Sequence, residues 1–167
     1  TTNPNPTNGT YDDGTSVVLT ATPNAGYQFD GWSGDAGGTS TTASVVMFAD
    51  RTVTATFSLI QRTLTVNATN GSVTTNPNPT NGTYNDGAVV ALTATPDAGY
   101  QFDGWSGDAS GTTNPLNITM DADKTVTATF SLIQRTLTVN ATNGSVTTNP
   151  NPTNGTYNNG TIIALTA

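Results

Sequence analysis

The residues best suited to chemistry lie in two copies of the motif Asp-Gly-Trp-Ser-Gly-Asp, at residues 30–35 and 103–108. Two carboxylates flanking a substrate are the catalytic pair of most glycoside hydrolases. Carboxylate oxygens are also the ligands that Ca²⁺ prefers. An indole between two carboxylates is, in addition, a flat surface on which a sugar ring can stack. The motif therefore raises three functions: glycoside hydrolysis, calcium binding and carbohydrate binding.

Hydrolysis is the weakest of the three. The chain has no Cys and no His, and all 11 acidic residues are Asp. These absences exclude Ser-His-Asp and Cys-His nucleophiles and also His- or thiolate-bound zinc. The same Asp pair recurs in the same loop of both copies, whereas enzymes rarely carry identical active sites side by side. We therefore expect no enzymatic activity and no cofactor.

Calcium binding is a better interpretation of the carboxylates, and its candidate ligands are Asp103, Asp108, Asp121 and Asp123. The twelve-residue Asp-rich calcium loop is nevertheless missing. An acidic pair at residues 12–13 becomes Asn-Asp at 85–86 and Asn-Asn at 158–159, a loss of charge that a ligand position would resist. We expect these Asp side chains to accept hydrogen bonds from nearby backbone N–H groups instead.

The aromatic residues around the motif have two interpretations. A ligand or adhesion site would expose Trp32, Trp105, Tyr27 and Tyr100 to solvent. A structural role would use the flanking glycines, Gly31, Gly34, Gly104 and Gly107, to form a sharp turn that folds each indole over a small core. We favour the structural role, because a chain with few large apolar residues needs the aromatic mass inside.

Composition restricts the partners. The formal net charge is −7 with only 4 Lys+Arg, so we expect neither nucleic acid nor an anionic membrane as a partner. Charged residues make up 9%, while 37 Thr and 19 Asn supply the polar surface, which is typical of extracellular proteins. No apolar run is long enough to insert into a membrane. The first residues do not resemble a signal peptide, so we expect any such peptide to be removed or to lie upstream.

Internal repetition decides the expected architecture. Residues 1–61 match residues 74–134 at 46 positions, and residues 62–85 match 135–158 at every position, always displaced by 73. We divide the chain into a first repeat (1–61) that lacks the segment RTLTVNATNGSV, a complete repeat (62–134) and the N-terminal part of a third (135–167). We expect these residues to be a window on a longer tandem array.

Within one repeat, apolar and polar residues alternate with period two. The alternation covers Arg62–Asn67, Val90–Ala94, Tyr100–Phe102, Leu116–Met120 and Val126–Phe130. Asn-Gly pairs at residues 70–71 and 81–82 predict hairpin turns. Residues 108–113 suit a short helix or a turn. Each repeat is thus predicted to be a small all-β module of about five or six strands.

The junction between repeats contains no flexible residue. The sequence KTVTATFSLIQRTLTV, which begins at Lys124, has neither Gly nor Pro. Apolar residues at the two junctions, expected to pack between neighbouring units, are Leu59, Ile60, Leu132 and Ile133. We therefore expect the modules to be joined in a stiff rod.

The order of these motifs resembles the divergent internalin B-repeat modules of bacterial and archaeal surface proteins. The signature occupies Gly87–Pro96, Gly99–Asp108, Met120–Lys124 and Thr125–Phe130, with equivalents in the first repeat. The resemblance implies a compact β-rich, β-grasp-like module strung in tandem on secreted or surface proteins, and no enzymatic activity. One departure is an apolar edge in the first repeat, where Val46 and Phe48 replace Thr119 and Asp121.

The repetition, the rigid junction and the missing catalytic residue types together predict a structural segment of an extracellular or cell-surface fibre or stalk. Its expected partners are neighbouring repeats or other copies of the same protein. Residues 135–146 of one chain carry the segment that residues 1–61 lack, so head-to-tail filaments by strand complementation are a further expectation. The alternative is an adhesin or carbohydrate-binding module that binds a surface glycan.

Overall fold

The structure, a computed structural model, describes residues 1–4 and 10–167. Within these ranges it contains strands and turns but no helix, so the prediction of an all-β chain is confirmed. Residues 108–113 form bends and an isolated bridge rather than a helix. The first copy of the sequence TTNPNPTNGTY falls partly on residues 5–9, outside the described residues. In the described ranges, no helix has the length and apolarity needed to cross a membrane.

The chain folds into two compact units. Unit 1 comprises residues 1–62 and 84–88, and unit 2 comprises residues 63–83 and 89–167. The compact units therefore differ from the sequence repeats, because the short segment 84–88 belongs with the repeat that precedes it.

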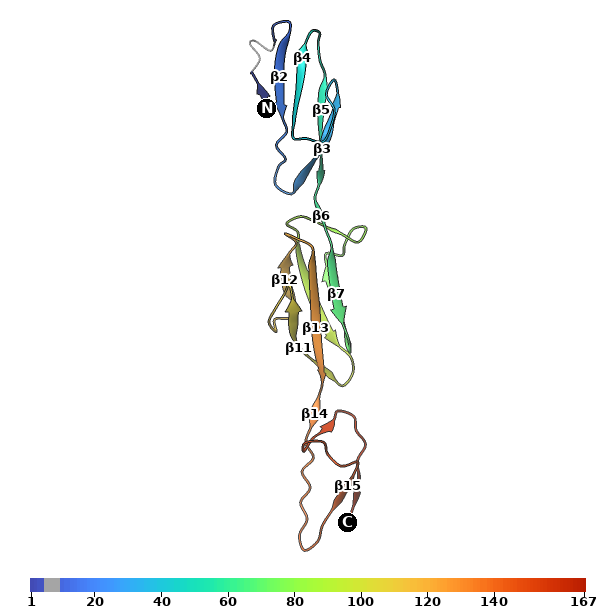
Figure 1. Ribbon diagram of the computed structural model, residues 1–167. Helices are drawn as coiled ribbons and strands as arrows, with labels where there is room; N and C mark the ends of the chain where they lie inside the picture. Colours follow the sequence, from blue (N-terminus) through green and yellow to red (C-terminus); the bar gives the residue numbers. More distant parts are fainter. Residues whose placement is uncertain (5–9) are drawn as a thin grey trace. The chain divides into compact units, whose positions relative to one another are not determined.

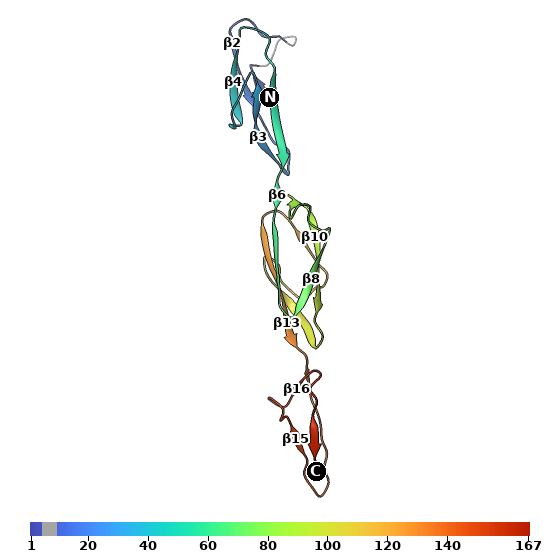
Figure 2. The ribbon, with the colours of Figure 1, turned by 90° about the vertical axis from the view of Figure 1, so that its right-hand side faces the viewer.

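Unit 2 contains two three-stranded sheets, with strand orders β11-β13-β7 and β12-β10-β8 (Figure 1). Their strands are β7 (Leu64–Ala68), β8 (Gly71–Asn76), β10 (Val89–Pro96), β11 (Tyr100–Gly107), β12 (Leu116–Thr119) and β13 (Lys124–Leu132). β13 is antiparallel to β11 and parallel to β7. Figure 2 shows β8 and β10 on one side of this unit and β13 on the other. Five of these strands correspond to the predicted alternating runs, and β8 is a sixth strand that the alternation did not mark.

The core of unit 2 lies between its sheets and follows the predicted alternation. The buried side chains on the two central strands are Val90, Leu92 and Ala94 of β10, and Val126, Ala128 and Phe130 of β13. Of the residues between them, Thr129 is exposed, and Ala91, Thr93 and Thr127 are half-buried. Because successive side chains on a strand point to opposite faces, the apolar set faces inward and the Thr-rich set faces solvent.

Both Asn-Gly pairs form turns, and the one at residues 81–82 lies between the bridged residues Thr80 and Thr83. The pair at residues 70–71 joins β7 to β8, which belong to different sheets, so the prediction of a hairpin there is wrong. Asn70 (φ 66°) precedes β8, and Asn81 (φ 51°) lies in the loop that follows it. Asn enters this left-handed region more readily than most residues, which explains its presence at both positions.

Unit 1 has the same arrangement with fewer strands. Its sheets are β1-β2-β4 and β3-β5. The strands are β1 (Thr2–Asn3), β2 (Thr15–Thr20), β3 (Tyr27–Gly34), β4 (Thr42–Met47) and β5 (Val53–Leu59). β1 corresponds to the last two residues of β8, and no strand among the described residues of unit 1 corresponds to β7. One edge of β5 is therefore unpaired in the part of the chain that the structure describes.

Short strands follow each long final strand. In unit 1, β6 (Gln61–Arg62) pairs with β9 (Tyr84–Asn85). In unit 2, β14 (Gln134–Arg135) pairs with β16 (Tyr157–Asn158), and β15 (Thr147–Asn149) pairs with β17 (Ala164–Thr166). The residues at the end of one sequence repeat thus pair with a short strand inside the next repeat.

Candidate functional site

The Asp-Gly-Trp-Ser-Gly motif lies inside a strand in both repeats, at the end of β3 and of β11. The predicted sharp turn at Gly31 and Gly104 is therefore wrong. The register of β11 against β13 shifts between Phe102 and Gly104, which is a β-bulge that leaves Asp103 as the extra residue. A bulge redirects the following side chain without ending the strand, and it does so in both copies.

The second glycine of the motif ends the strand for a steric reason. Gly34 (φ 86°) and Gly107 (φ 90°) adopt a conformation that side chains disfavour. A Cβ atom there would overlap the carbonyl oxygen of Thr52 or Thr125, respectively. The glycine thus allows close approach of two backbones beside each Trp.

Each indole packs inward. Trp105 is 5% exposed, and Trp32 is half-buried. The Trp105 ring meets Phe102 edge-on at 5.1 Å between centroids, and its Nε1–H donates to the carbonyl oxygen of Thr113 at 2.8 Å. In the first repeat Nε1–H of Trp32 donates to the carbonyl oxygen of Ser40 at 2.8 Å. Trp105 is thus a core residue, as the structural interpretation expects.

The Asp residues of the motif accept hydrogen bonds from neighbouring strands. Asp103 accepts from the Ser131 hydroxyl at 2.8 Å, and Asp30 accepts from Ser58 at 2.7 Å. Asp108 accepts from the backbone N–H of Thr125 at 2.7 Å.

Asp35 makes the same backbone bond and also an ion pair. It accepts from the N–H of Thr52 at 2.7 Å and pairs with Arg51 at 3.0 Å. The Thr52 N–H and then the Arg51 guanidinium hold the pKa of Asp35 below its ordinary value.

The calcium candidates are also engaged in local bonds. Asp121 pairs with Lys124 at 2.7 Å, and Asp123 accepts from the N–H of Thr63 at 2.8 Å. Among residues 1–4 and 10–167, no group of three or more carboxylate, His or Cys side chains is arranged to hold a metal ion. Calcium binding at these residues gains no support from this geometry.

The remaining predicted residues lie at the ends of the paired long strands. Tyr27 is opposite Leu59, and Tyr100 is opposite Leu132. Tyr27, Leu59 and Leu132 are each about two-fifths exposed, at 42%, 41% and 39%. Tyr100 is half-buried.

Ile60 lies between β5 and β6, and Ile133 lies between β13 and β14. Both side chains are half-buried, and both residues form backbone hydrogen bonds. The N–H of Ile60 donates to Gly26, and its carbonyl accepts from the N–H of Asp86 at 2.9 Å. Ile133 makes the equivalent bonds to Gly99 and Asn159 at 2.8 Å. The bonds to Asp86 and Asn159 connect the end of each long strand to a turn within the next sequence repeat.

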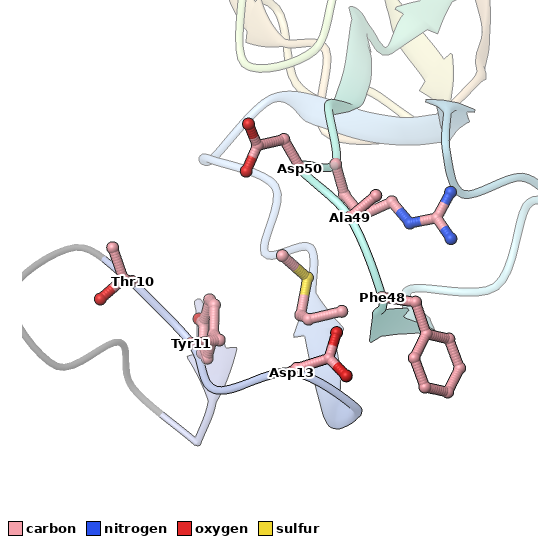
Figure 3. A pocket seen from close by; sticks show the side chains of 8 residues that line it. Thr10, Tyr11, Asp13, Phe48, Ala49 and Asp50 are labelled. Carbon is pink, nitrogen blue, oxygen red and sulfur yellow. The ribbon is translucent and has the colours of Figure 1, made fainter.

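A hollow of about 520 Å³ lies at one end of unit 1 (Figure 3). Tyr11 and Asp13 line one side, and Asp50 lies on the other. Phe48, which replaces an Asp of the second repeat, is 68% exposed and projects away from Tyr11. The sequence analysis predicted an unusually apolar edge here, and in the structure the Phe48 ring is exposed to solvent.

A second opening of about 520 Å³ runs along the unpaired edge of β5, and we call it the lateral groove. Its apolar lining is formed by Leu19, Ala21, Trp32, Ala55 and Phe57, with Thr1 and Thr2 at its rim. Of these lining residues, only Trp32 was predicted from the sequence as a candidate site residue. The others could have been found by comparing the two repeats, because their equivalents in unit 2 are buried in the core.

One family matches the chain in two consecutive segments. The family described as the divergent InlB B-repeat domain matches residues 1–61 and again residues 62–134. No curated protein and no solved structure matches the chain. The two matched segments together cover most of the 167 residues, and they are tandem copies of one structural repeat module.

Proposed function

The chain belongs to the family of divergent InlB B-repeat domains, and from this premise we propose that it is a structural segment of an extracellular or cell-surface stalk or fibre. Domains of this type occur in surface proteins, and the family is a repeat-domain family rather than an enzyme family. The segment holds another part of a surface assembly at a distance. Its partners are neighbouring repeats or further copies of the same chain.

The observation that carries this proposal is the way each repeat continues into the next. β13 and β14 are separated by Ile133 alone, and β14 pairs at once with β16. The Gln134 side chain adds a bond from Nε2–H to Asn158 Oδ1 at 2.7 Å, and Gln61 makes the equivalent bond to Asn85 at 2.9 Å. Because the strand that leaves each repeat pairs with residues of the next repeat, consecutive repeats are held together by backbone hydrogen bonds, as a load-carrying stalk requires.

Small-angle X-ray scattering tests the proposal on chains that carry one, two or three additional copies of residues 62–134. We expect the maximum dimension to increase by the same amount with each copy, because every junction repeats the same bonds. A matched control replaces Gln134 and Arg135 by Gly, which removes the side-chain bonds and loosens β14. Dimensions that grow much more slowly than the number of repeats in the unmodified chains would contradict a stiff stalk.

The alternative function, an adhesin or glycan-binding module, requires accessible indoles. Both indole N–H groups donate to carbonyl oxygens of the same unit, and Trp105 is buried. The geometry therefore favours the structural function. Iodide quenching of tryptophan fluorescence separates the two proposals, since a sugar-stacking surface needs strong quenching of both indoles.

A further inference from the structure

β4 is an edge strand of unit 1, and one of its sides is open. The sheet order is β1-β2-β4, and no strand within residues 1–4 and 10–167 pairs with the side of β4 that faces away from β2. The equivalent strand of the second repeat, β12, is also an edge, in the order β12-β10-β8. The second repeat has chain before it and after it, so the open edge is a property of the fold of a single repeat.

The edge of the second repeat carries three features that disfavour pairing with another strand. β12 is short, with the four residues Leu116–Thr119. Pro115 precedes it and has no backbone N–H. Asp121 follows it, with a side chain that is 70% exposed. A short strand, a proline and a charged side chain are means by which proteins protect sheet edges.

β4 lacks the first two of these protections. It is longer, with the six residues Thr42–Met47. Thr42 stands at the position of Pro115, so β4 keeps the backbone N–H that the second repeat has lost. The backbone of β4 is therefore able to pair along its whole length.

The third protection is replaced by apolar side chains. Val46 and Phe48 stand where the second repeat has Thr119 and Asp121, and they are 39% and 68% exposed. Asp121 is similarly open in a repeat that has chain on both sides, so the exposure of this position also belongs to the repeat fold. Long, uncharged and apolar sheet edges are templates for pairing with a further strand.

The backbone groups of alternate residues in β4 face the open side. The N–H of Ala21 donates to the carbonyl oxygen of Thr41 at 2.8 Å, so the odd-numbered residues of this segment bond towards β2. Successive residues of a strand direct their N–H and C=O groups to opposite sides. The groups of Thr42, Ser44 and Val46 therefore face away from β2.

Two of these outward groups make local bonds that do not block pairing. The N–H of Thr42 donates to the Ser40 hydroxyl at 3.3 Å, which is longer than an ordinary N–H···O bond. The carbonyl oxygen of Val46 accepts from the N–H of Phe48 at 3.1 Å and has a second lone pair. Both groups are thus able to bond to a second strand.

We propose that β4 of a second copy of this chain pairs antiparallel with β4 at this edge, so that two copies associate side by side. The twofold axis lies at Ser44, which faces Ser44 of the second copy, while Thr42 faces Val46. This register uses the outward groups of all three residues. The contact is an addition of a strand to a sheet edge, and it closes as a dimer because both copies use the same surface. It goes beyond the proposed stalk function, which concerns contacts along one chain.

Charge favours β4 itself as the partner of β4. Residues 36–49 contain no charged side chain, although the whole chain carries a formal net charge of −7. Pairing of β4 with β4 therefore brings no like charges face to face. Pairing of β4 with β12 of another copy would instead meet the missing N–H of Pro115 and the carboxylate of Asp121.

The size of the contact sets the expected affinity. One strand pair buries less surface than a standard interface, so we expect a dimer Kd of about 10–1000 μM. The net charge makes copies repel one another at long range, and added salt screens this repulsion. Association should therefore strengthen when salt is raised.

The first test is sedimentation equilibrium of the full chain and of the double variant Val46→Thr/Phe48→Asp, which gives this edge the residues of the second repeat. The average mass of the unmodified chain should rise from monomer towards dimer as its concentration approaches about 1 mM. We expect the double variant to dimerise about ten-fold more weakly or less, because a carboxylate then flanks the edge. Val89→Thr is the matched control: it removes a 57% exposed valine from the central strand β10 and should leave association unchanged.

The second test is disulfide trapping, which is clean because the chain has no Cys. Opposite residues of a hydrogen-bonded antiparallel pair have Cα atoms about 5.5 Å apart, within the range of a disulfide. Ser44→Cys should therefore form covalent dimers on mild oxidation. Ser16→Cys is the matched control, since Ser16 is exposed but lies on the central strand β2, and it should remain largely monomeric.

Three outcomes would overturn the inference. These are a constant monomer mass without Ser44→Cys dimers, equal association of the double variant and the unmodified chain, or equal cross-linking of Ser44→Cys and Ser16→Cys. None of them changes the scattering series, which depends on the junctions between repeats. Failure of this contact is therefore distinguishable from failure of the proposed function.

Discussion

The residues of the Asp-Gly-Trp-Ser-Gly-Asp motif act mainly by holding the backbones of neighbouring strands together. In both repeats the last Asp of the motif accepts a hydrogen bond from a Thr backbone N–H, that of Thr52 for Asp35 and that of Thr125 for Asp108. The N–H of each Asp donates in return to the carbonyl oxygen of the same Thr. A carboxylate that accepts a backbone N–H bond is stabilised in its charged form. The acidic pairs thus position strands, and this role explains why both copies keep them.

Asp35 makes the free energy of unfolding depend on pH in the acid range. Its pKa in the folded chain lies below the ordinary value of 3.8, chiefly because of the Thr52 N–H and then Arg51. Its contribution is therefore complete above about pH 4 and is lost as the pH falls through the folded pKa. Asp35→Asn should lower the melting temperature near pH 7 by about 1–2 °C, since the group is exposed. Thermal melts at pH 7 and pH 2.5 check this, and an equal loss at both values would contradict it.

The steric role of Gly34 gives a sharper prediction. Gly34→Ala forces a Cβ against the Thr52 carbonyl at a positive φ, so it should destabilise unit 1 by about 1–3 kcal/mol. Gly37→Ala is the control, because a Cβ there meets no atom within 4 Å. Urea unfolding followed by Trp32 fluorescence compares them. Equal midpoints for the two variants would show that the close approach is not required.

At the scale of elements, the pair β7 and β8 decides whether a repeat has a closed core. β7 adds the third strand to one sheet, and β8 adds the third strand to the other. With them, Leu92 and Val126 are fully buried at 0% exposure. In unit 1 only the two residues of β1 correspond to β8 and no described strand corresponds to β7, and the equivalents Leu19 and Val53 are half-buried. The segment RTLTVNATNGSV therefore acts as the cover of the module.

A matched pair of glycines tests this role. Gly71→Ala places a Cβ within 3 Å of the Phe130 ring and should destabilise unit 2 by about 1–3 kcal/mol. Gly144→Ala, at the equivalent position 73 residues later, meets nothing within 4 Å and should be neutral in dilute solution. Denaturant unfolding monitored by Trp105 fluorescence measures both. A destabilised Gly144→Ala chain at low concentration would contradict the open state of that segment.

At the scale of the whole molecule, the two units have unequal cores. Among the described residues, 4 buried apolar side chains belong to unit 1 and 11 belong to unit 2. The ones in unit 1 are Val17, Ala21, Val45 and Tyr84. Because burial of apolar surface is the main favourable term in folding, the units should differ in stability.

Unfolding should therefore occur in two steps. With Trp105→Phe the remaining Trp32 reports unit 1, and with Trp32→Phe the remaining Trp105 reports unit 2. We expect the unit 1 reporter to melt lower by roughly 10 °C or more, because several fewer large side chains are buried. Fluorescence melts at low protein concentration measure the difference. Coincident transitions would mean that the two units unfold as one.

The sequence by itself determined the all-β class, the 73-residue repetition, the inward alternation along β10 and β13, and the Asn-Gly turns at Asn70 and Asn81. These features are local or periodic: each depends on the order of neighbouring residues, and near-identical copies reinforce the pattern. The absence of His and Cys likewise excluded their catalytic chemistry without any structure. The core role of Trp105 was also predictable, because so few large apolar residues were available.

Only the tertiary structure decided how the glycines of the motif act and which strands cover the core of a repeat. Asp103 bulges out of β11 because of its register against β13, where Phe102 pairs with Phe130 and Gly104 with Thr129. A prediction of a turn from Gly104 and its neighbours does not include this distant strand. The parallel pairing of β7 with β13 joins residues about 60 positions apart, so the burial of Phe130 at the end of β13 depends on a segment that no local pattern relates to it. Sequence periodicity specifies which side of a strand is apolar, but contacts between distant strands decide whether that side is covered.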